Sequence, residues 1–88
     1  MRLSQEELKE TQDRLRRIEG QIRGIQRMLQ ERDCAEVVVQ IAAARSALQR
    51  VAFLILQGYT RECLAGLRRG EGDEGEIEEL LHSYLTLS

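Results

Sequence analysis

The sequence predicts an all-α fold: a three-helix protomer in which a helical hairpin is followed by a short C-terminal helix. The 88 residues include no proline and are rich in residues that favour helices. Apolar residues recur at alternating steps of three and four, the spacing of one helix face. Capping sequences mark helix starts at Ser4 and Asp33. We expect a single domain over residues 1–88.

The first helix is predicted over residues 4–32. It begins with Ser-Gln-Glu-Glu at 4–7, a capping box in which Glu7 stands three residues after Ser4. Its apolar residues follow an a/d heptad that only Thr11 interrupts: Leu8, Leu15, Ile18, Ile22, Ile25 and Leu29. This helix is therefore expected to pack along one apolar seam.

The second helix is predicted over residues 34–67, after the capping sequence Asp-Cys-Ala-Glu at 33–36. Cys34 would be its first residue, where unpaired backbone N–H groups and the helix dipole favour a thiolate. The helix carries two apolar seams, one of Val37, Ile41, Ala44, Leu48, Val51 and Ile55, the other of Val38, Ala42, Ala52, Leu56, Tyr59 and Cys63. Two seams indicate the central helix of an oligomeric bundle. Gly58 is the position where this helix is most easily interrupted.

A linker is predicted over residues 68–75, which contain three glycines among charged residues. A third helix is expected over residues 76–87, with Asp73 and Glu76 as a cap. One face of this helix is apolar: Ile77, Leu80, Leu81, Tyr84 and Leu85. It is expected to pack through that face.

The two cysteines, Cys34 and Cys63, lie 29 positions apart on the predicted second helix. A continuous helix would hold their sulfurs roughly 40 Å apart, far beyond disulfide distance. If the thiols act together, they must do so between chains. An antiparallel pair of these helices sets Cys34 beside Cys63 of its partner, with the symmetry centre between Leu48 and Gln49. The alternative is that each cysteine is simply a small buried hydrophobe.

Size and cysteine usage bound the class of protein. A chain this short, with three aromatic residues, is expected to gain stability by oligomerisation. Two cysteines without a secretion signal indicate reduced thiols and a cytoplasmic protein. No run of 18 apolar residues is present, so we expect no membrane segment.

Charge is distributed unevenly along the chain. Residues 1–69 carry 13 basic and 9 acidic side chains, whereas residues 70–88 carry six acidic and no basic ones. Arginines concentrate on the first helix, with two more on the second: Arg14, Arg16, Arg17, Arg23, Arg27, Arg45 and Arg50. Arginine suits phosphate because its planar fork donates two hydrogen bonds. The alternative is a solvated charged face, and no helix-turn-helix, zinc-finger or basic-zipper spacing is present.

Four segments resemble the CsoR/RcnR family of bacterial repressors. They are Arg14-Leu-Arg-Arg-Ile-Glu-Gly-Gln-Ile-Arg-Gly-Ile-Gln-Arg-Met28, then Asp33-Cys34 with Gln40-Ile-Ala-Ala-Ala-Arg-Ser-Ala-Leu-Gln-Arg50, and Glu62-Cys63. The resemblance covers most of residues 8–67. It implies an antiparallel four-helix-bundle dimer, a dimer of dimers as the homotetramer, and binding to operator DNA. Arg14 and Arg50 match family arginines that contact DNA, and Arg16 and Arg17 are their expected neighbours in that contact.

The resemblance also indicates which kind of effector would make the repressor release DNA. Copper-sensing members hold the metal by Cys, His and Cys, and Cys34 and Cys63 match the two cysteines. Tyr59 stands at the histidine position, and a phenol is a hard ligand that Cu(I) does not prefer. His82, in the tail helix, is expected to be an incidental surface residue. Arg61 and Glu62 flank the second thiol with opposite charges.

This pattern is similar to the CsoR-like sulfurtransferase repressor branch, which keeps both cysteines and lacks the histidine. In that branch, reactive sulfur species (persulfide or polysulfide) bridge the cysteines of two protomers and DNA is released. The sequence therefore predicts a persulfide-sensing repressor without a cofactor; the alternative is a Cu(I)-responsive repressor with two thiolate ligands. An enzyme is not expected, because no substrate pocket, oxyanion site or general base is recognisable. A sulfur carrier and a helical interaction module remain as rivals.

Overall fold

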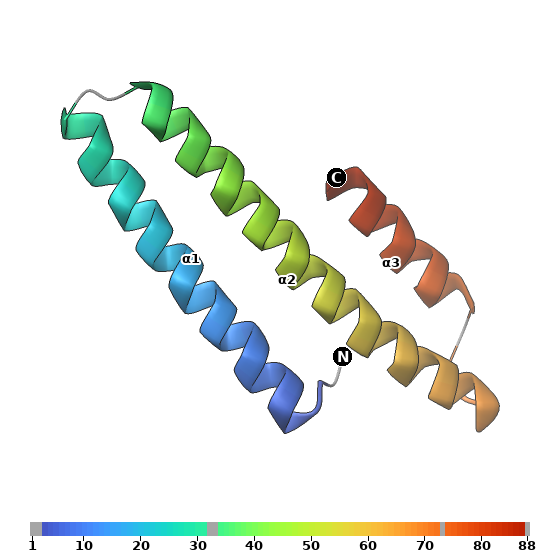
Figure 1. The fold of residues 1–88 in the computed structure, drawn as a ribbon. Helices are drawn as coiled ribbons and strands as arrows, with labels where there is room; N and C mark the ends of the chain where they lie inside the picture. The colour runs from blue at the N-terminus through green and yellow to red at the C-terminus, as the bar shows by residue number, and fades with distance from the viewer. Residues whose placement is uncertain (1–2, 32–33, 73, 88) are drawn as a thin grey trace.

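The computed structural model of the protein describes residues 3–31, 34–72 and 74–87. Three helices form in order: α1 (Gln5–Glu31), α2 (Cys34–Arg68) and α3 (Glu74–Leu87). α1 and α2 form an antiparallel hairpin, and α3 runs back along α2 on the side away from α1 (Figure 1). The Cα atoms extend 57 × 26 × 11 Å, so the three helices form a single flat layer. The predicted all-α class and the hairpin with a short third helix are confirmed.

The predicted capping box starts α1. The Ser4 N–H donates to Glu7 Oε1 at 2.9 Å, and the Glu7 N–H donates to Ser4 Oγ at 3.1 Å. These two bonds satisfy backbone groups that have no partner inside the helix, which is why α1 begins at Gln5. The capping residues predicted for the other helices, Asp33 and Asp73, lie outside the described residues.

α2 runs through Gly58 without interruption and ends at Arg68. Its end is a Schellman motif: the Glu71 N–H donates to the Gly66 carbonyl at 2.7 Å, and the Gly70 N–H donates to the Leu67 carbonyl at 3.0 Å. Gly70 adopts φ 79°, a conformation that glycine reaches without steric cost.

The connection to α3 is shorter than the predicted linker over residues 68–75. α3 begins at Glu74, two residues before the predicted start, and Gly75 lies inside the helix. The acidic residues Glu74 and Glu76 occupy its first turn. Negative charge there is stabilised by the helix dipole, which accounts for the earlier start.

The heptad seams divide into rows spaced seven residues apart, and the rows have different neighbours. On α1, Thr11 and Ile18 are buried, with 6% and 4% exposed. On α2, the buried row comprises Val37, Ala44, Val51 and Gly58. These rows form the α1–α2 interface. Thr11, which interrupts the apolar pattern in the sequence, is thus a buried member of the interface.

The remaining row of each helix lies uncovered. We call this set the open stripe; its members are Leu8, Leu15, Ile22 and Leu29 of α1 with Ile41 and Leu48 of α2, all exposed. A hollow of about 330 Å³ opens between the helices there, lined by Ile22, Ile25, Ile41 and Leu48 among others. The hairpin therefore leaves a continuous part of its apolar seams exposed.

The dimensions of the chain agree with this incomplete burial. The accessible surface is 6840 Å², whereas a compact monomer of this mass would expose about 5,300 Å². The radius of gyration is 16.8 Å, against about 12 Å for a compact domain of this length. A single helical layer has no second layer to cover its faces, so association with further chains is the physical route to a core.

α3 covers part of the second seam of α2. The rings of Phe53 and Tyr84 lie 6.4 Å apart between centroids and are tilted by 54°. A nearby hollow is lined by Ala52, Leu56 and Leu80, with Ile55, Ser83, Tyr84 and Leu87. The N-terminal part of this seam extends beyond α3, and Val38 there is 65% exposed.

By length and composition, α2 is the one described helix long and apolar enough to cross a membrane. The sequence contains no unbroken run of 18 apolar residues, so the sequence alone did not predict that this helix could span a membrane. The central helix of a helical assembly has the same length and composition. α2 also carries Arg45 and Arg50 near its middle, and each would cost roughly 2.5–3.5 kcal/mol at the centre of a bilayer. Packing against α1, α3 and further chains explains its apolar residues better.

Candidate functional site

The two thiols lie near opposite ends of α2. Both cysteines are free; Cys34 is exposed and Cys63 is half-buried. Because α2 is continuous between them, their separation along the helix axis is about 43 Å at 1.5 Å per residue. One chain therefore cannot bring the two sulfurs together, as the sequence predicted. Their pairing with the thiols of a second chain stays a prediction.

Cys34 is the first residue of α2, as expected from the sequence. An exposed sulfur at a helix N-terminus faces unpaired backbone N–H groups and solvent, an environment in which thiols react readily. This position offers access to an effector from outside the molecule. Among the residues that the structure describes, Cys34 belongs to no group of three His, Cys, Asp or Glu side chains that could hold a metal ion.

Cys63 has close neighbours from two helices. Its sulfur lies 3.8 Å from Glu76 Oε2 of α3 and donates a hydrogen bond to it. A hollow of about 290 Å³ is lined by Cys63 with Tyr59, Glu62, Glu76 and others. The predicted neighbours Tyr59 and Glu62 thus share a hollow with the thiol. Glu76 was missed, because nothing local in the sequence shows that α3 folds back onto Cys63.

Tyr59 lies one helical turn before Cys63 and contributes a phenol at the position where the resemblance implies an imidazole in copper-sensing members. Electrostatic interaction with Cys63 and with Glu76, together with desolvation, raises the pKa of Tyr59 above its ordinary value. The phenol therefore stays protonated at neutral pH and is a weak ligand for a soft metal ion. His82 is exposed on α3.

Within one chain, the described residues include no group of three His, Cys, Asp or Glu side chains placed to hold a metal ion. Two thiolates suit a soft ion such as Cu(I), but they are separated by most of the length of α2. A metal bound by both cysteines would have to draw its ligands from two chains.

The predicted DNA-binding arginines lie on α1 and α2, and local acids accompany two of them. Arg14 Nη2 lies 3.3 Å from Glu10 Oε1, and Arg16 Nη1 lies 2.9 Å from Asp13 Oδ1. These two arginines are therefore partly neutralised by acidic residues of their own helix. Arg17 is exposed on the same helix.

Arg50 lies on α2 with its guanidinium carbon 5.5 Å from the centroid of the Phe53 ring. This stacking holds the long side chain against the helix surface without neutralising its charge. Because Phe53 also contacts Tyr84, the position of Arg50 depends on the packing of α3.

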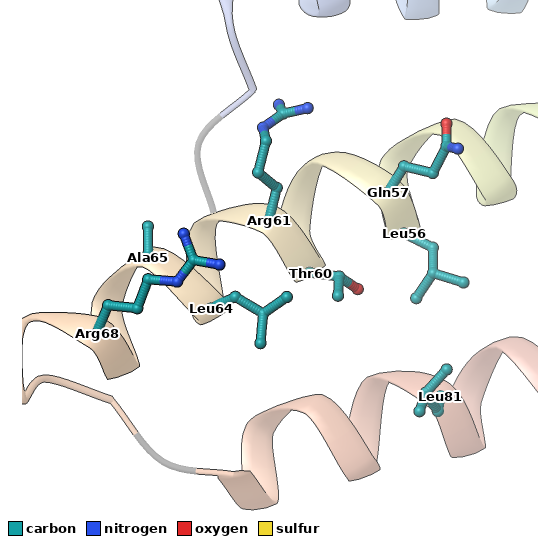
Figure 2. A pocket seen from close by; sticks show the side chains of 8 residues that line it. All are labelled: Leu56, Gln57, Thr60, Arg61, Leu64, Ala65, Arg68 and Leu81. Atoms are coloured by element: carbon teal, nitrogen blue, oxygen red, sulfur yellow. The ribbon is translucent and has the colours of Figure 1, made fainter.

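Between α2 and α3 lies a hollow of about 530 Å³. Leucines of both helices line it, and Arg61 and Arg68 lie at its edge (Figure 2). Neither cysteine lines it. No catalytic group such as a thiol or imidazole faces it, so its lining indicates helix packing and gives no sign of a reaction site.

The fold and its thiols define a class: all-α proteins with uncovered apolar rows, two free cysteines near the ends of one long helix, and exposed arginines. Comparison with known proteins identifies the family within that class. The family model for the metal-sensitive transcriptional repressors matches residues 7–84. The chain belongs to this family, whose members are repressors and not enzymes.

Individual relatives agree with this assignment. The copper-sensing transcriptional repressor CsoR of Bacillus subtilis is 40% identical over 83 residues, 92% of this chain and 81% of that protein. The crystal structure of the copper-sensing repressor CsoR with Cu(I) from Geobacillus thermodenitrificans has a TM-score of 0.81 with this fold. It is 35% identical, with coverage of 98% of this chain and 91% of that chain.

The nickel-responsive transcriptional regulator InrS is also similar in structure. Its TM-score is 0.69 and its identity is 44%, with coverage of 99% of this chain and 94% of that chain. The relatives thus respond to more than one metal. Family membership is incompatible with the sulfur-carrier and the non-DNA-binding interaction readings considered from the sequence.

Proposed function

We propose that this protein is a cytoplasmic repressor that binds operator DNA as a homotetramer and releases it when Cu(I) binds. The metal would be held by Cys34 of one chain and Cys63 of its neighbour. The observation that carries this proposal is the pair of free cysteines near the two ends of one uninterrupted helix. Two of the relatives described above are copper-sensing repressors.

The open stripe supports the assembly. Two hairpins that cover each other's open stripe form a four-helix bundle, which hides the exposed leucines and isoleucines of both chains. In an antiparallel arrangement, the Cys34 end of one α2 lies beside the Cys63 end of the other. Two such dimers make the proposed tetramer, which would cover the apolar residues that remain outside the bundle.

The chemistry of the donors supports Cu(I). A thiolate is a soft ligand, and Cu(I) is a soft ion that accepts two sulfur ligands. Each thiol must lose its proton to bind, so the hydrogen bond from Cys63 to Glu76 must be given up. The chain supplies no imidazole beside Cys63, which distinguishes it from a Cys-His-Cys site.

That difference favours a second candidate effector, a persulfide or polysulfide. The Cys34 thiolate would attack the sulfane sulfur of a persulfide, releasing a thiolate and leaving Cys34 as a persulfide. The Cys63 thiolate of the neighbouring chain would then attack the inner sulfur and release hydrosulfide. The product is a disulfide between chains, and polysulfide would give longer sulfur bridges. The half-buried thiol beside the protonated Tyr59 phenol supports this reading.

Arginines would provide the DNA contacts in either case. Arg17 and Arg50 are exposed, and Arg14 and Arg16 can exchange their carboxylate partners for phosphate. Arg50→Ala should weaken operator binding about tenfold, the loss of one good arginine contact, while sedimentation shows an unchanged oligomer. Unchanged DNA affinity in this variant would exclude Arg50 from the interface.

One experiment separates the two effectors. The reduced protein is bound to a duplex from the region upstream of its own gene, and anisotropy follows release on adding Cu(I) without oxygen or adding sodium tetrasulfide. A competing Cu(I) chelator gives the metal affinity, and intact mass reports covalent sulfur bridges. Release by Cu(I) with tight binding supports the first candidate; release only by tetrasulfide, with bridged mass, replaces it with the second. Release by neither contradicts both.

A further inference from the structure

The N-terminal end of α1 is joined to the C-terminal part of α2 by an ion pair that spans 54 residues of sequence. Arg61 Nη2 donates to Glu7 Oε1 at 2.6 Å and to Glu7 Oε2 at 2.7 Å. Other ion pairs of the described chain, such as Lys9–Asp13 and Arg16–Asp13, join residues on the same helix turn. We call the group Leu3, Glu7, Gly58 and Arg61 the clasp.

Gly58 makes this close approach possible. A Cβ atom at this position would collide with the Leu3 side chain and would lie 3.3 Å from Glu7 Oε2. The absence of a side chain at Gly58 thus lets the start of α1 lie directly on α2. This explains why a glycine, which weakens a helix, is placed inside an otherwise continuous α2.

The Glu7 carboxylate is held from two sides. It accepts the Ser4 N–H of the capping box as well as the Arg61 guanidinium. The Arg61 hydrogen bond, followed by those from Ser4, lowers the pKa of Glu7 to about 2. The carboxylate is therefore charged throughout the neutral range, and one side chain both starts α1 and attaches it to α2.

The clasp connects the two functional regions of the chain. Arg61 lies two residues before Cys63 on α2 and projects away from Leu81 and α3, toward α1 (Figure 2). Glu7 lies seven residues, about two turns, before Arg14 on α1. Leu8, the first apolar residue of α1, belongs to the open stripe and is 46% exposed, so it adds little to the packing of α1 on α2 at this end.

We propose that the clasp transmits the state of Cys63 to the basic surface of α1, with Glu7 and Arg61 as positioning residues. This inference rests on the proposed function and adds how, within one chain, the effector site would be coupled to the DNA-binding surface. A displacement of the end of α2 on effector binding moves Arg61, and Arg61 moves the start of α1 through Glu7. The arginines of α1 then shift relative to those of α2, and the two sets no longer fit the same DNA.

An exposed ion pair contributes little to folding stability, so coupling and folding can be tested separately. Glu7→Gln keeps a residue that can close the capping box but removes the charge that Arg61 binds. Arg61→Gln removes the other partner, and Arg61→Lys restores a charge. Glu6→Gln and Arg68→Gln are matched controls that change exposed residues outside the clasp.

The measured quantity is the operator Kd in the presence of effector divided by the operator Kd in its absence. It is measured at one salt concentration, once with Cu(I) and once with sodium tetrasulfide. Glu7→Gln and Arg61→Gln should each reduce this ratio at least about fivefold, whereas the controls stay at the wild-type ratio. The double variant Glu7→Gln with Arg61→Gln should reduce the ratio no more than either single variant does. Arg61→Lys should recover part of the ratio. Operator affinity without effector, Cu(I) affinity and helical circular dichroism should be unchanged.

The outcomes distinguish this inference from the proposed function. If the wild-type protein releases DNA with an effector and the clasp variants release it equally well, the proposal for the clasp is wrong and the proposed function is unaffected. Variants with altered Cu(I) affinity or altered operator affinity without effector also overturn it, since the residues would then belong to a binding site. A wild-type protein that releases DNA with neither effector overturns the proposed function and this inference together.

Discussion

The two cysteines occupy environments that differ more than their equal chemistry suggests. Cys34 begins α2 and is open to solvent, whereas Cys63 is half-buried and donates a hydrogen bond to Glu76. The clasp also lies at the Cys63 end of the helix. For the proposed function, the comparison predicts a division of roles: Cys34 would meet an effector first, and the state of Cys63 would affect the packing of the chain.

Removal of either thiol is the strongest test of this division. Cys34→Ser should abolish effector-dependent release of operator DNA, because a hydroxyl neither binds Cu(I) well nor attacks a persulfide. Operator binding without effector should be retained. Cys63→Ser should give the same loss in an anisotropy titration, and a Cys34→Ser protein that still releases DNA normally would contradict the thiol mechanism.

In the proposed assembly, the pairing of Cys34 with Cys63 of the neighbouring chain would depend on association through the open stripe. Leu48→Glu places a charge on this stripe, where burial between chains would be unfavourable by several kcal/mol. Sedimentation should show a smaller species, and the response to effector should disappear with the oligomer. Ser46→Glu adds the same charge at an exposed position two residues away and should sediment like wild type. An intact oligomer in Leu48→Glu would show that the stripe is not the interface.

The missing imidazole beside Cys63 can be restored. Tyr59→His should tighten Cu(I) binding at least about tenfold, or about 1.4 kcal/mol, because imidazole is a far better Cu(I) ligand than a neutral phenol. A chelator competition without oxygen measures the change. Tyr84→His, two turns beyond Glu76 on α3, provides a control with the same added group. Equal Cu(I) affinity in Tyr59→His and wild type would place the metal elsewhere.

Thiol reactivity compares the two ends directly. In the reduced, folded protein, iodoacetamide should alkylate Cys34 about fivefold faster than Cys63 or more, given its exposure and its position at a helix N-terminus. Peptide mass spectrometry over a time course gives both rates. The difference should vanish in denaturant, and equal rates in the folded protein would remove the distinction between the two thiols.

The smallest expected effect concerns pH. The pKa of Glu7 is lowered from 4.5 to about 2 in the folded chain, so its contribution to stability is complete above about pH 5 and is lost as the pH falls toward 2. The difference in Tm between wild type and Glu7→Gln should therefore be small at neutral pH and should shrink across that interval. A difference that grows on acidification would show that the ion pair is not what stabilises this end.

Local features of the fold were predictable from the sequence. The Ser4–Glu7 capping box and the start of α2 at Cys34 depend on neighbouring residues, and both were predicted. The boundaries of the third helix were less accurate, because its start depends on the acidic residue Glu74 as much as on a cap. Thr11 was read as an interruption because periodicity measures polarity, whereas burial follows the position of a residue on the helix.

Residue contacts at the candidate site were less predictable. The spacing of Cys34 and Cys63 marked the two thiols, whereas the resemblance to the family marked Tyr59 and the DNA-binding arginines. It did not indicate that Glu76 reaches Cys63 or that Glu7 binds Arg61, because these pairs are 13 and 54 residues apart. A carboxylate in a helical sequence is most often a solvated surface residue, and only the packing of two helices shows which one has a partner.

The sequence by itself determined the helices and the wide separation of the two sulfurs, because helical hydrogen bonds and the rise per residue act over a few positions. The tertiary structure decided which heptad rows meet, which remain open, and which carboxylates approach Cys63 and Arg61. Those contacts depend on how separate helices dock, and docking depends on side chains far apart in the chain.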